Sequence, residues 1–298
     1  MALFVAALAT VIVSGLYWRQ FVLLRTVENQ QLTSQSRLLL HGALDWARSI
    51  LREDAARSTY DALSEAWAQP LAETRLDQIG ETSPLASQAT MAGSIEDAQS
   101  RLNLHNLVRA DGSIDPSQQE ILARLADLLA LPQATAALVA DFVSQAYVPP
   151  SADGAVQNAR PLPLLFGEDL ARVPGIDPAA VLRLTPYVAV LDERTPVNFN
   201  TAPAELVAAC IGGLSLSDAR ALVADRDRTY FTNTGDIRNR LRGRGQGFSD
   251  NDVSVASRYF FIRGEIKLSR ADTRIEALVK RGAPGQLAPV DVLWERQL

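Results

Sequence analysis

The N-terminal part of the chain is apolar all round at first and then apolar on one side only. Its first 18 residues, MALFVAALATVIVSGLYW, carry no charge, and the first charged residue is Arg19. An uncharged run of about 18 residues is just long enough to cross a bilayer. Beyond it, apolar residues recur at helical spacing, at Leu32, Leu39, Ala43, Ala47 and Ile50. Since no proline occurs before Pro70, we predict one helix of about 55 residues, roughly 80 Å long, with a transmembrane part over residues 1–24.

The rest of the chain changes its pattern twice. A strand is expected over residues 97–104, and from residue 117 to about 241 the pattern predicts helices joined by short loops. The last 48 residues alternate apolar and polar positions, which predicts an antiparallel meander of three strands. This order favours an α+β fold in which a large all-α domain, residues 105–250, is inserted into a domain formed by residues 25–104 and 251–298.

Composition narrows the class of protein. The chain has 298 residues, 47% of them hydrophobic, and its net charge of −5 argues against a general nucleic-acid binder. Cys210 is the single cysteine and is expected to be a buried apolar residue. No Lys or Arg precedes the apolar run, unlike in a secretory signal peptide. We therefore interpret the run as a retained anchor, or as the start of a mature chain whose short basic leader lies outside this numbering.

Several stretches resemble the K-type minor pseudopilins of type II secretion systems. The resemblance covers nearly the whole chain and is carried by DWARSILRED, EAWAQPL, SIEDAQSRLNLHNLV, VPGIDPAAVLRLTPYVAVLD and PVNFNTAPAELVAA. It implies a pseudopilin fold, in which a long N-terminal helix packs on an antiparallel sheet, with the all-α domain inserted into the sheet region. It also implies a non-enzymatic subunit of the bacterial inner membrane, single-pass, with most of the chain in the periplasm.

The same resemblance implies partners. The subunit would sit at the tip of the pseudopilus and assemble with minor pseudopilins I and J, and with H as a further candidate. There it would initiate or cap the fibre that drives protein export across the outer membrane. A prepilin peptidase would mature the N-terminus, which would then be methylated, and secreted cargo or the outer-membrane channel are further candidate partners. No nucleic-acid partner is implied.

Assembly residues are expected on the long helix. Met1, Leu3, Phe4 and Val5 would enter the membrane, and Val5 occupies the position at which most pilins carry a glutamate, if Met1 is the mature start. A carboxylate there costs about 3 kcal/mol in the bilayer and is kept only for a function. In filaments of this family that glutamate is implied to pair with the N-terminal amine of a neighbouring subunit. A subunit with no neighbour above it has no such amine to pair with, so Val5 would fit a place at the tip. An apolar residue at this position is also ordinary in any membrane helix.

Three further helix residues, Leu32, Leu39 and Trp46, are hypothesised to lie partly on a surface that faces other subunits. The alternative is that they only seal the subunit's own sheet.

Calcium is the one candidate cofactor. Relatives of this family have been described with bound calcium, and calcium requires several oxygen ligands that converge. FSDNDVS offers Asp250 and Asp252 where the insert should rejoin the sheet, and Glu96 and Asp97 lie on the other arm of that junction. We predict that calcium braces the junction at these four residues; the alternative is that they are solvated turn acids.

The alternative function is a membrane-anchored helix-hairpin-helix protein for DNA binding or uptake. Its hairpin would be Gly212-Gly213-Leu214, which departs from the Gly-hydrophobic-Gly pattern that cradles phosphate. The arginines Arg238, Arg240, Arg242 and Arg244 form the only basic cluster nearby, and they are expected to be solvated or to contact lipid or a channel protein. Catalysis has little support, because neither histidine, His41 or His105, lies near Cys210 in sequence.

Overall fold

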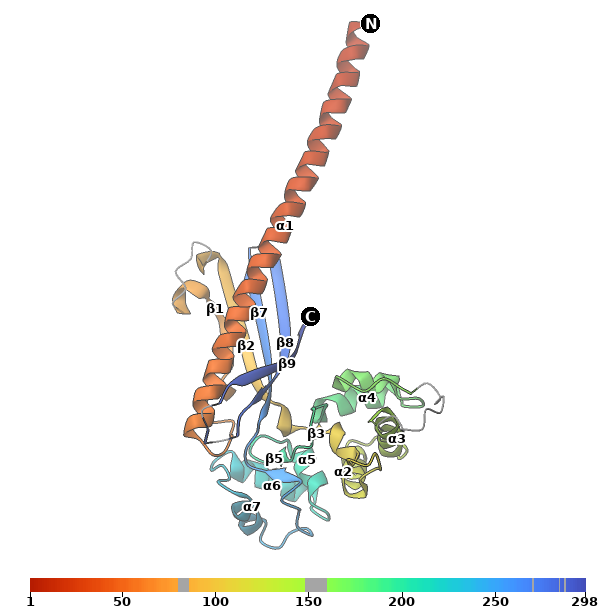
Figure 1. The fold of residues 1–298 in the computed structure, drawn as a ribbon, viewed down its shortest axis with the longest axis vertical. Coiled ribbons are helices and arrows are strands. Elements are labelled where there is room, and N and C mark those ends of the chain that lie inside the picture. Colours follow the sequence, from red (N-terminus) through yellow and green to blue (C-terminus); the bar gives the residue numbers. More distant parts are fainter. Residues whose placement is uncertain (80–85, 148–159, 270, 284, 287) are drawn as a thin grey trace.

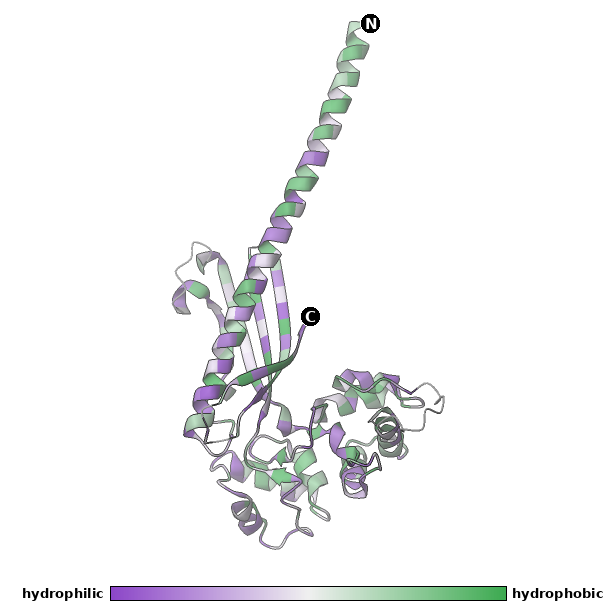
Figure 2. Ribbon diagram, in the orientation of Figure 1, coloured by the Kyte–Doolittle hydropathy of each residue, from purple (hydrophilic) through white to green (hydrophobic). Residues whose placement is uncertain are grey.

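One long helix, α1 (Ala2–Arg57), forms the axis of the molecule (Figure 1). The computed structural model describes residues 1–79, 86–147, 160–269, 271–283, 285–286 and 288–298. Every residue up to number 27 is exposed, so the first half of α1 projects away from the folded part. Figure 2 shows that this projecting half is mostly hydrophobic, whereas the second half is mixed. The predicted single helix is confirmed, and its apolar part is long enough to cross a membrane by length and composition.

A twisted antiparallel sheet packs against the second half of α1. In the described part of the chain it has five strands in the order β1-β2-β7-β8-β9. They are β1 (Leu71–Arg75), β2 (Ala89–Asp97), β7 (Tyr259–Leu268), β8 (Ala271–Arg281) and β9 (Val290–Gln297). The predicted C-terminal meander β7-β8-β9 is confirmed. The strand predicted at 97–104 is present only over Leu102–Asn103, outside this sheet: β2 ends at Asp97, and a 3-10 turn, Ala98–Ser100, follows it.

The face of α1 that meets the sheet is displaced from the predicted one. Its buried residues are Ser36, Leu40, Leu44, Ala47, Leu51 and Ala55. Of the predicted stripe only Ala47 is buried; the other members lie on the neighbouring flank, half-buried at the edge of the same core. Two adjacent lines of α1 are thus apolar, and periodicity alone could not say which one the sheet covers.

Close packing of helix and sheet depends on a glycine in β7. Gly93 of β2 lies opposite Gly264 of β7. A Cβ atom at Gly264 would come within 3.3 Å of Leu40 Cδ2, which is tighter than an ordinary contact, so the bare backbone here lets α1 approach the sheet.

The helical lobe is spliced into the sheet between β2 and β7, which are neighbours. Its helices are α2 (Pro116–Leu128), α3 (Thr135–Tyr147), α4 (Pro178–Leu184), α5 (Ala204–Cys210), α6 (Leu216–Arg226) and α7 (Thr234–Leu241). Short parallel pairs join its segments, β3 (Leu102–Asn103) with β4 (Val188–Ala189), and β5 (Val197–Asn198) with β6 (Val253–Ser254). A hydrophobic core runs from Leu102 to Val255 and brackets the predicted insert. The lobe lies at the end of the molecule away from the N-terminus and extends to one side (Figure 1).

Candidate assembly surface

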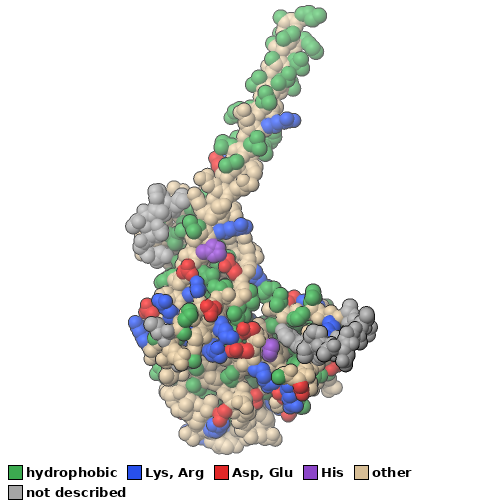
Figure 3. Space-filling model, in the orientation of Figure 1, with side chains coloured by type: hydrophobic (Ala, Val, Ile, Leu, Met, Phe, Trp, Pro, Cys, Tyr) green, Lys and Arg blue, Asp and Glu red, His purple; other side chains and the backbone are tan. Residues whose placement is uncertain are grey.

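The projecting half of α1 presents its side chains to the surroundings on every side. Met1 and Leu3 are almost fully exposed, and Phe4 and Val5 keep 73% and 62% of their surface. Figure 3 shows hydrophobic side chains along this segment, with basic and acidic groups gathered lower down on the folded part. A helix whose exposed surface is apolar all round fits a lipid environment. The role of these four residues in assembly stays a prediction.

The second half of α1 has one polar flank, which is bound to the sheet edge. Arg37 Nη2 donates to Gln297 Oε1 at 3.0 Å, and Arg48 Nε donates to the carbonyl oxygen of Val290 at 2.8 Å. His41 Nδ1 lies 3.6 Å from Glu295 Oε2. These contacts hold α1 along β9, so this flank is already occupied within the subunit.

The opposite flank is apolar and open. It carries Leu32, Leu39, Ala43, Trp46 and Ile50, which lie on one line of the helix. Leu32 and Leu39 pack partly against the sheet core, whereas Trp46 is 48% exposed. The two leucines therefore seal the sheet in part, and Trp46 faces outward; contact of the three residues with other subunits stays a prediction.

A groove with a volume of about 90 Å³ follows this open flank. Its wall on the helix side includes Leu40, Ala43 and Trp46, and its floor is formed by the Gly93–Gly264 pair of the sheet. The groove is mainly apolar because aliphatic and aromatic side chains, among them Ile50, Trp67 and Met91, line it beside the bare glycine backbone. An apolar groove beside a half-exposed tryptophan has the chemistry of a protein–protein contact.

The predicted calcium ligands on β2 have separate partners. Successive residues of a strand point to opposite faces, so Glu96 and Asp97 diverge. Glu96 forms ion pairs with Arg101, at 3.0 Å, and with Arg263. Asp97 is buried and accepts four hydrogen bonds, from Gln99 N, Asn198 Nδ2, Thr201 Oγ1 and Ser257 Oγ, at 2.6 to 2.9 Å. Burial raises the pKa of Asp97 above its ordinary value.

The two predicted ligands in the lobe are also separated. Asp250 forms an exposed ion pair with Arg238 at 2.6 Å, and Asp252 accepts from Gln118 Nε2. Within the described ranges the structure does not gather Asp250, Asp252, Glu96 and Asp97 into one group of carboxylates. Calcium bound by these four residues together stays an untested prediction that this geometry does not favour.

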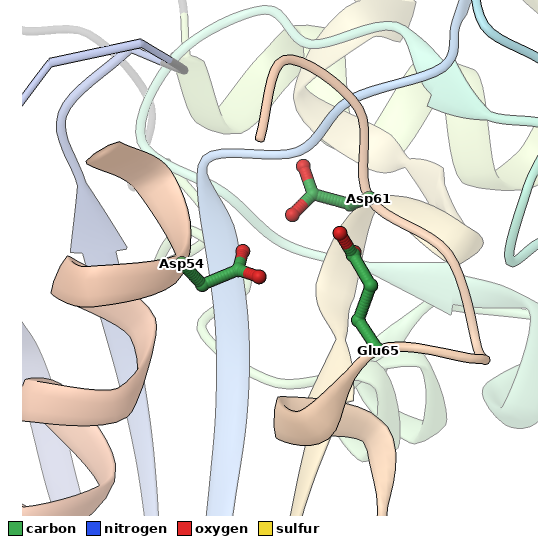
Figure 4. A group of neighbouring side chains, drawn as sticks. All are labelled: Asp54, Asp61 and Glu65. Atoms are coloured by element: carbon green, nitrogen blue, oxygen red, sulfur yellow. The ribbon is translucent and has the colours of Figure 1, made fainter. Parts of the chain in front are cut away.

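A different acidic group lies where α1 ends. Carboxylate oxygens of Asp54, Asp61 and Glu65 lie within 4.8 Å of one another and point into one space (Figure 4). Arg281, at the end of β8 and 2% exposed, donates to Asp54 Oδ2 at 2.7 Å and also to Asp61. Because Asp61 is fully buried, desolvation raises its pKa to about 7 despite the neighbouring guanidinium. A cation of the chain itself thus bridges two of these acids.

This buried cluster continues into the lobe. Asp61 Oδ2 accepts from the backbone N–H of Ser257 at 2.7 Å, and its carbonyl oxygen accepts from Asn198 Nδ2 at 3.1 Å. Asn198 also donates to Asp97, which links the end of β2 to the same network. The network ties together the end of α1, the sheet and the lobe. Sequence reasoning missed it because its members lie up to 227 residues apart.

Charged contacts fix the lobe against the other face of the sheet. Glu276 of β8 lies between Arg263, at 2.8 Å, and Arg296, at 2.5 Å, and Arg296 reaches Glu168 of the lobe at 3.3 Å. The Arg296 guanidinium also stacks over Phe166 at 4.2 Å. Mixed ionic and aromatic contacts of this kind give the lobe a defined orientation.

The hairpin considered for phosphate binding is covered. The carbonyl oxygen of Gly212 accepts from the backbone N–H of Gln246 at 2.7 Å, so the glycine-rich loop lies on the hairpin. At the start of α6, Ser215 accepts from the N–H of Asp218, and Asp218 is paired with Arg244 at 3.1 Å. An acidic group and its own arginine thus occupy the place where a phosphate would sit.

The arginine cluster is used within the lobe. Arg238 pairs with Asp250, Arg240 with Asp236 at 2.8 Å, and Arg244 with Asp218. Arg242 is exposed in a left-handed conformation at the end of α7. Three of the four predicted surface arginines therefore have acidic partners in the lobe.

The residues weighed for catalysis are dispersed. His41 lies on the polar flank of α1, and His105 is half-buried in a 3-10 turn, Leu104–Leu107. Burial raises the pKa of the Cys210 thiol to about 12, so little thiolate exists at neutral pH. These three groups do not form a nucleophile with its base.

A membrane-length helix that continues into a sheet-packed helix, with a lobe spliced between two adjacent strands, defines a pseudopilin with an inserted domain. Family models of type II secretion system protein K match residues 100–193 and 197–256, together more than half of the chain. The chain belongs to the type II secretion system protein K family.

Known relatives agree with this assignment. The type II secretion system protein K of Pseudomonas aeruginosa is 27% identical over 304 residues, which cover 96% of this chain and 88% of that protein. A chain in the crystal structure of the GspK-GspI-GspJ complex from enterotoxigenic Escherichia coli has the same fold, with a TM-score of 0.68 and 22% identity. The match covers 91% of this chain and 99% of that one. The family is a structural component of the secretion system, and the apolar helix fits a single-pass anchor in the inner membrane.

Proposed function

We propose that this pseudopilin is the tip subunit of a type II secretion pseudopilus and assembles with minor pseudopilins I and J. The observation that carries the proposal is the open apolar flank of α1 with its adjoining groove. A relative of the same fold was crystallised in a complex with GspI and GspJ, and the flank and groove offer a surface of suitable chemistry for such partners. H is a further candidate partner.

The position of the lobe supports a place at the tip. It lies at the end of α1 opposite to the membrane segment and extends beyond the sheet on one side (Figure 1). The buried network around Arg281 and Asp97 and the contacts of Glu276 fix its orientation, so the subunit is broad at its outer end. A broad and rigid outer end would hinder the addition of another subunit above it and could push against secreted cargo or the channel.

The N-terminus is consistent with the same role. Val5 offers no carboxylate to the amine of a neighbour, and a subunit that begins the fibre needs none. The proposed orientation places the N-terminus at the inner membrane, after maturation by prepilin peptidase and N-methylation, and the folded part in the periplasm. Calcium is kept as a candidate stabilising ion, to be tested by thermal unfolding after chelation.

The test compares two charge substitutions on α1. Trp46→Glu places a carboxylate beside the groove, while Leu38→Glu changes a residue that is 73% exposed and lies on the far side of the helix. Chains from about residue 25 onward are purified with minor pseudopilins I and J. We expect Trp46→Glu to weaken the ternary complex about tenfold or more and Leu38→Glu to leave it unchanged. Equal binding by both variants would contradict the proposed surface.

A further inference from the structure

The uncharged part of α1 ends in an aromatic and basic belt. Tyr17 and Trp18 are 70% and 67% exposed, and Phe21 follows one turn later. Arg19 and Arg25 stand among them on the helix. At the usual rise, Trp18 lies about 24 Å from Ala2, close to the thickness of the hydrocarbon layer. The belt therefore falls at the level where lipid chains give way to headgroups.

The side chains of the belt contact one another. The rings of Trp18 and Phe21 have their centroids 6.3 Å apart, and the Arg25 guanidinium lies 5.2 Å from the centre of the Phe21 ring. Arg25 Nη1 is 3.2 Å from Glu28 Oε2. Both partners of this ion pair are about half exposed, and exposed pairs contribute little, so Arg25 is available to a stronger anion.

We propose that Arg19 and Arg25, framed by Tyr17, Trp18 and Phe21, bind the headgroups of anionic phospholipids in the outer leaflet of the inner membrane. The proposal rests on the single-pass orientation given above, in which the folded part lies beyond that leaflet. It adds a lipid partner to a helix that otherwise would be only an apolar anchor.

Charge and geometry both favour a phosphate partner. Glu28 is the first carboxylate in the sequence, so no acid precedes or separates the two arginines. Among the described residues no carboxylate pairs with Arg19. A guanidinium binds phosphate through two parallel hydrogen bonds, and its long stem can lie along the apolar helix while the charge stays in the headgroup layer. Tyr and Trp favour the same layer because their rings are apolar with one polar edge.

The lipid contact has a consequence for assembly. A subunit that is raised into a fibre must withdraw Arg19 and Arg25 from the anionic layer. The belt would therefore hold the free subunit at a fixed depth and oppose its extraction until contacts with partners replace the lipid.

The test measures lipid selectivity on the full chain. The protein is reconstituted in nanodiscs of phosphatidylcholine with a minority of phosphatidylglycerol, and spin-labelled forms of each lipid report their association with the helix. We expect phosphatidylglycerol to be preferred about fivefold for each arginine. Arg19→Gln with Arg25→Gln should abolish the preference, and Arg19→Lys with Arg25→Lys should largely retain it.

A matched control removes two charges elsewhere on α1. Arg52→Gln with Arg57→Gln lies beyond the membrane segment and should leave the preference intact. Equal association of the two lipids with the unaltered chain, or a preference that survives in the Arg19→Gln, Arg25→Gln variant, would overturn the lipid site alone. Failure of the unaltered chain to co-purify with the nanodiscs would instead overturn the proposed anchoring, and the lipid site with it.

Discussion

Replacing Arg281 by methionine should destabilise the fold by an amount that depends on pH. Met keeps most of the apolar stem but removes the charge, which donates to Asp54 and Asp61 and lies 4.7 Å from the centre of the Phe260 ring. Removing one partner of a buried ion pair typically costs several kcal/mol, because the other charge is left without compensation.

The magnitude follows from the titration of Asp61. Its pKa is about 7 in the folded chain, well above the ordinary 3.8 of an aspartate. The folded state therefore binds the proton more tightly, and the stability from this group is full below pH 4 and lost as the pH rises through 7. Without Arg281 the pKa of Asp61 rises further, so the loss continues above pH 7 at about 1.4 kcal/mol per pH unit.

We therefore expect Arg281→Met to lower the free energy of unfolding by about 2 kcal/mol at pH 5 to 6. At this pH Asp61 is protonated with or without Arg281, so the loss comes from the hydrogen bonds of Arg281. At pH 8 the cost should reach about 3 to 4 kcal/mol. Urea unfolding of the chain from about residue 25 onward measures both values, since the residues before number 28 are all exposed.

A second variant isolates the carboxylate. In Asp61→Asn with Arg281→Met, residue 61 cannot ionise, so the additional cost at pH 8 should disappear. A cost for Arg281→Met that is equal at pH 5 and pH 8, or that stays below about 1 kcal/mol at pH 8, would refute the assignment of Arg281 as the counter-ion of Asp61.

Two further changes probe packing. Ser36 Oγ is buried and has no hydrogen-bond partner in the described structure, so Ser36→Ala should stabilise the chain by about 1 kcal/mol in urea unfolding; a loss of stability would show that the hydroxyl is bonded. Gly245 and Gly243 both have a φ of +76°, but only at Gly245 would a Cβ meet another side chain, 2.6 Å from Ile211 Cγ2. Gly245→Ala should therefore cost about 2 kcal/mol more than Gly243→Ala, and equal melting temperatures would count against this packing.

Periodicity predicted the elements that are long and regular. The helix α1, the meander β7-β8-β9 and the lobe helices α2 and α3 all follow from their spacing of apolar residues. The strand β2 was displaced by about eight residues in the prediction, because ATMAGSIED is rich in small residues and lacks the usual β-branched alternation. One of those small residues has a tertiary reason: a Cβ atom at Gly93 would come within 3.0 Å of the carbonyl oxygen of Arg263 in the neighbouring strand β7.

The candidate surface was predicted in part. Trp46 was identified from the sequence and is exposed beside the groove, but periodicity could not decide which of two apolar lines on α1 the sheet would bury. The contacts between the polar flank of α1 and β9 could not be predicted from the sequence, because neither Arg37 nor Val290 differs from an ordinary surface or strand residue in its own segment. The network of Arg281, Asp61 and Asp97 joins parts of the chain that meet only in the folded state, so no pattern within one segment could reveal it.

The lobe leaves the sheet and returns to it at adjacent points, because Asp97 at the end of β2 is paired with Phe260 at the start of β7. In principle a tight turn between β2 and β7 could replace about 160 residues without altering the strand order. The obstacle is chemical, since Asp97 depends on Asn198 and Thr201 of the lobe for its hydrogen bonds. A trimmed chain would need an apolar residue at position 97 and polar residues in place of Phe261 and Leu278, which are buried against Ala189 and Leu191 of the lobe. The lobe therefore shares part of its core with the sheet, and removing it would require redesign of that face.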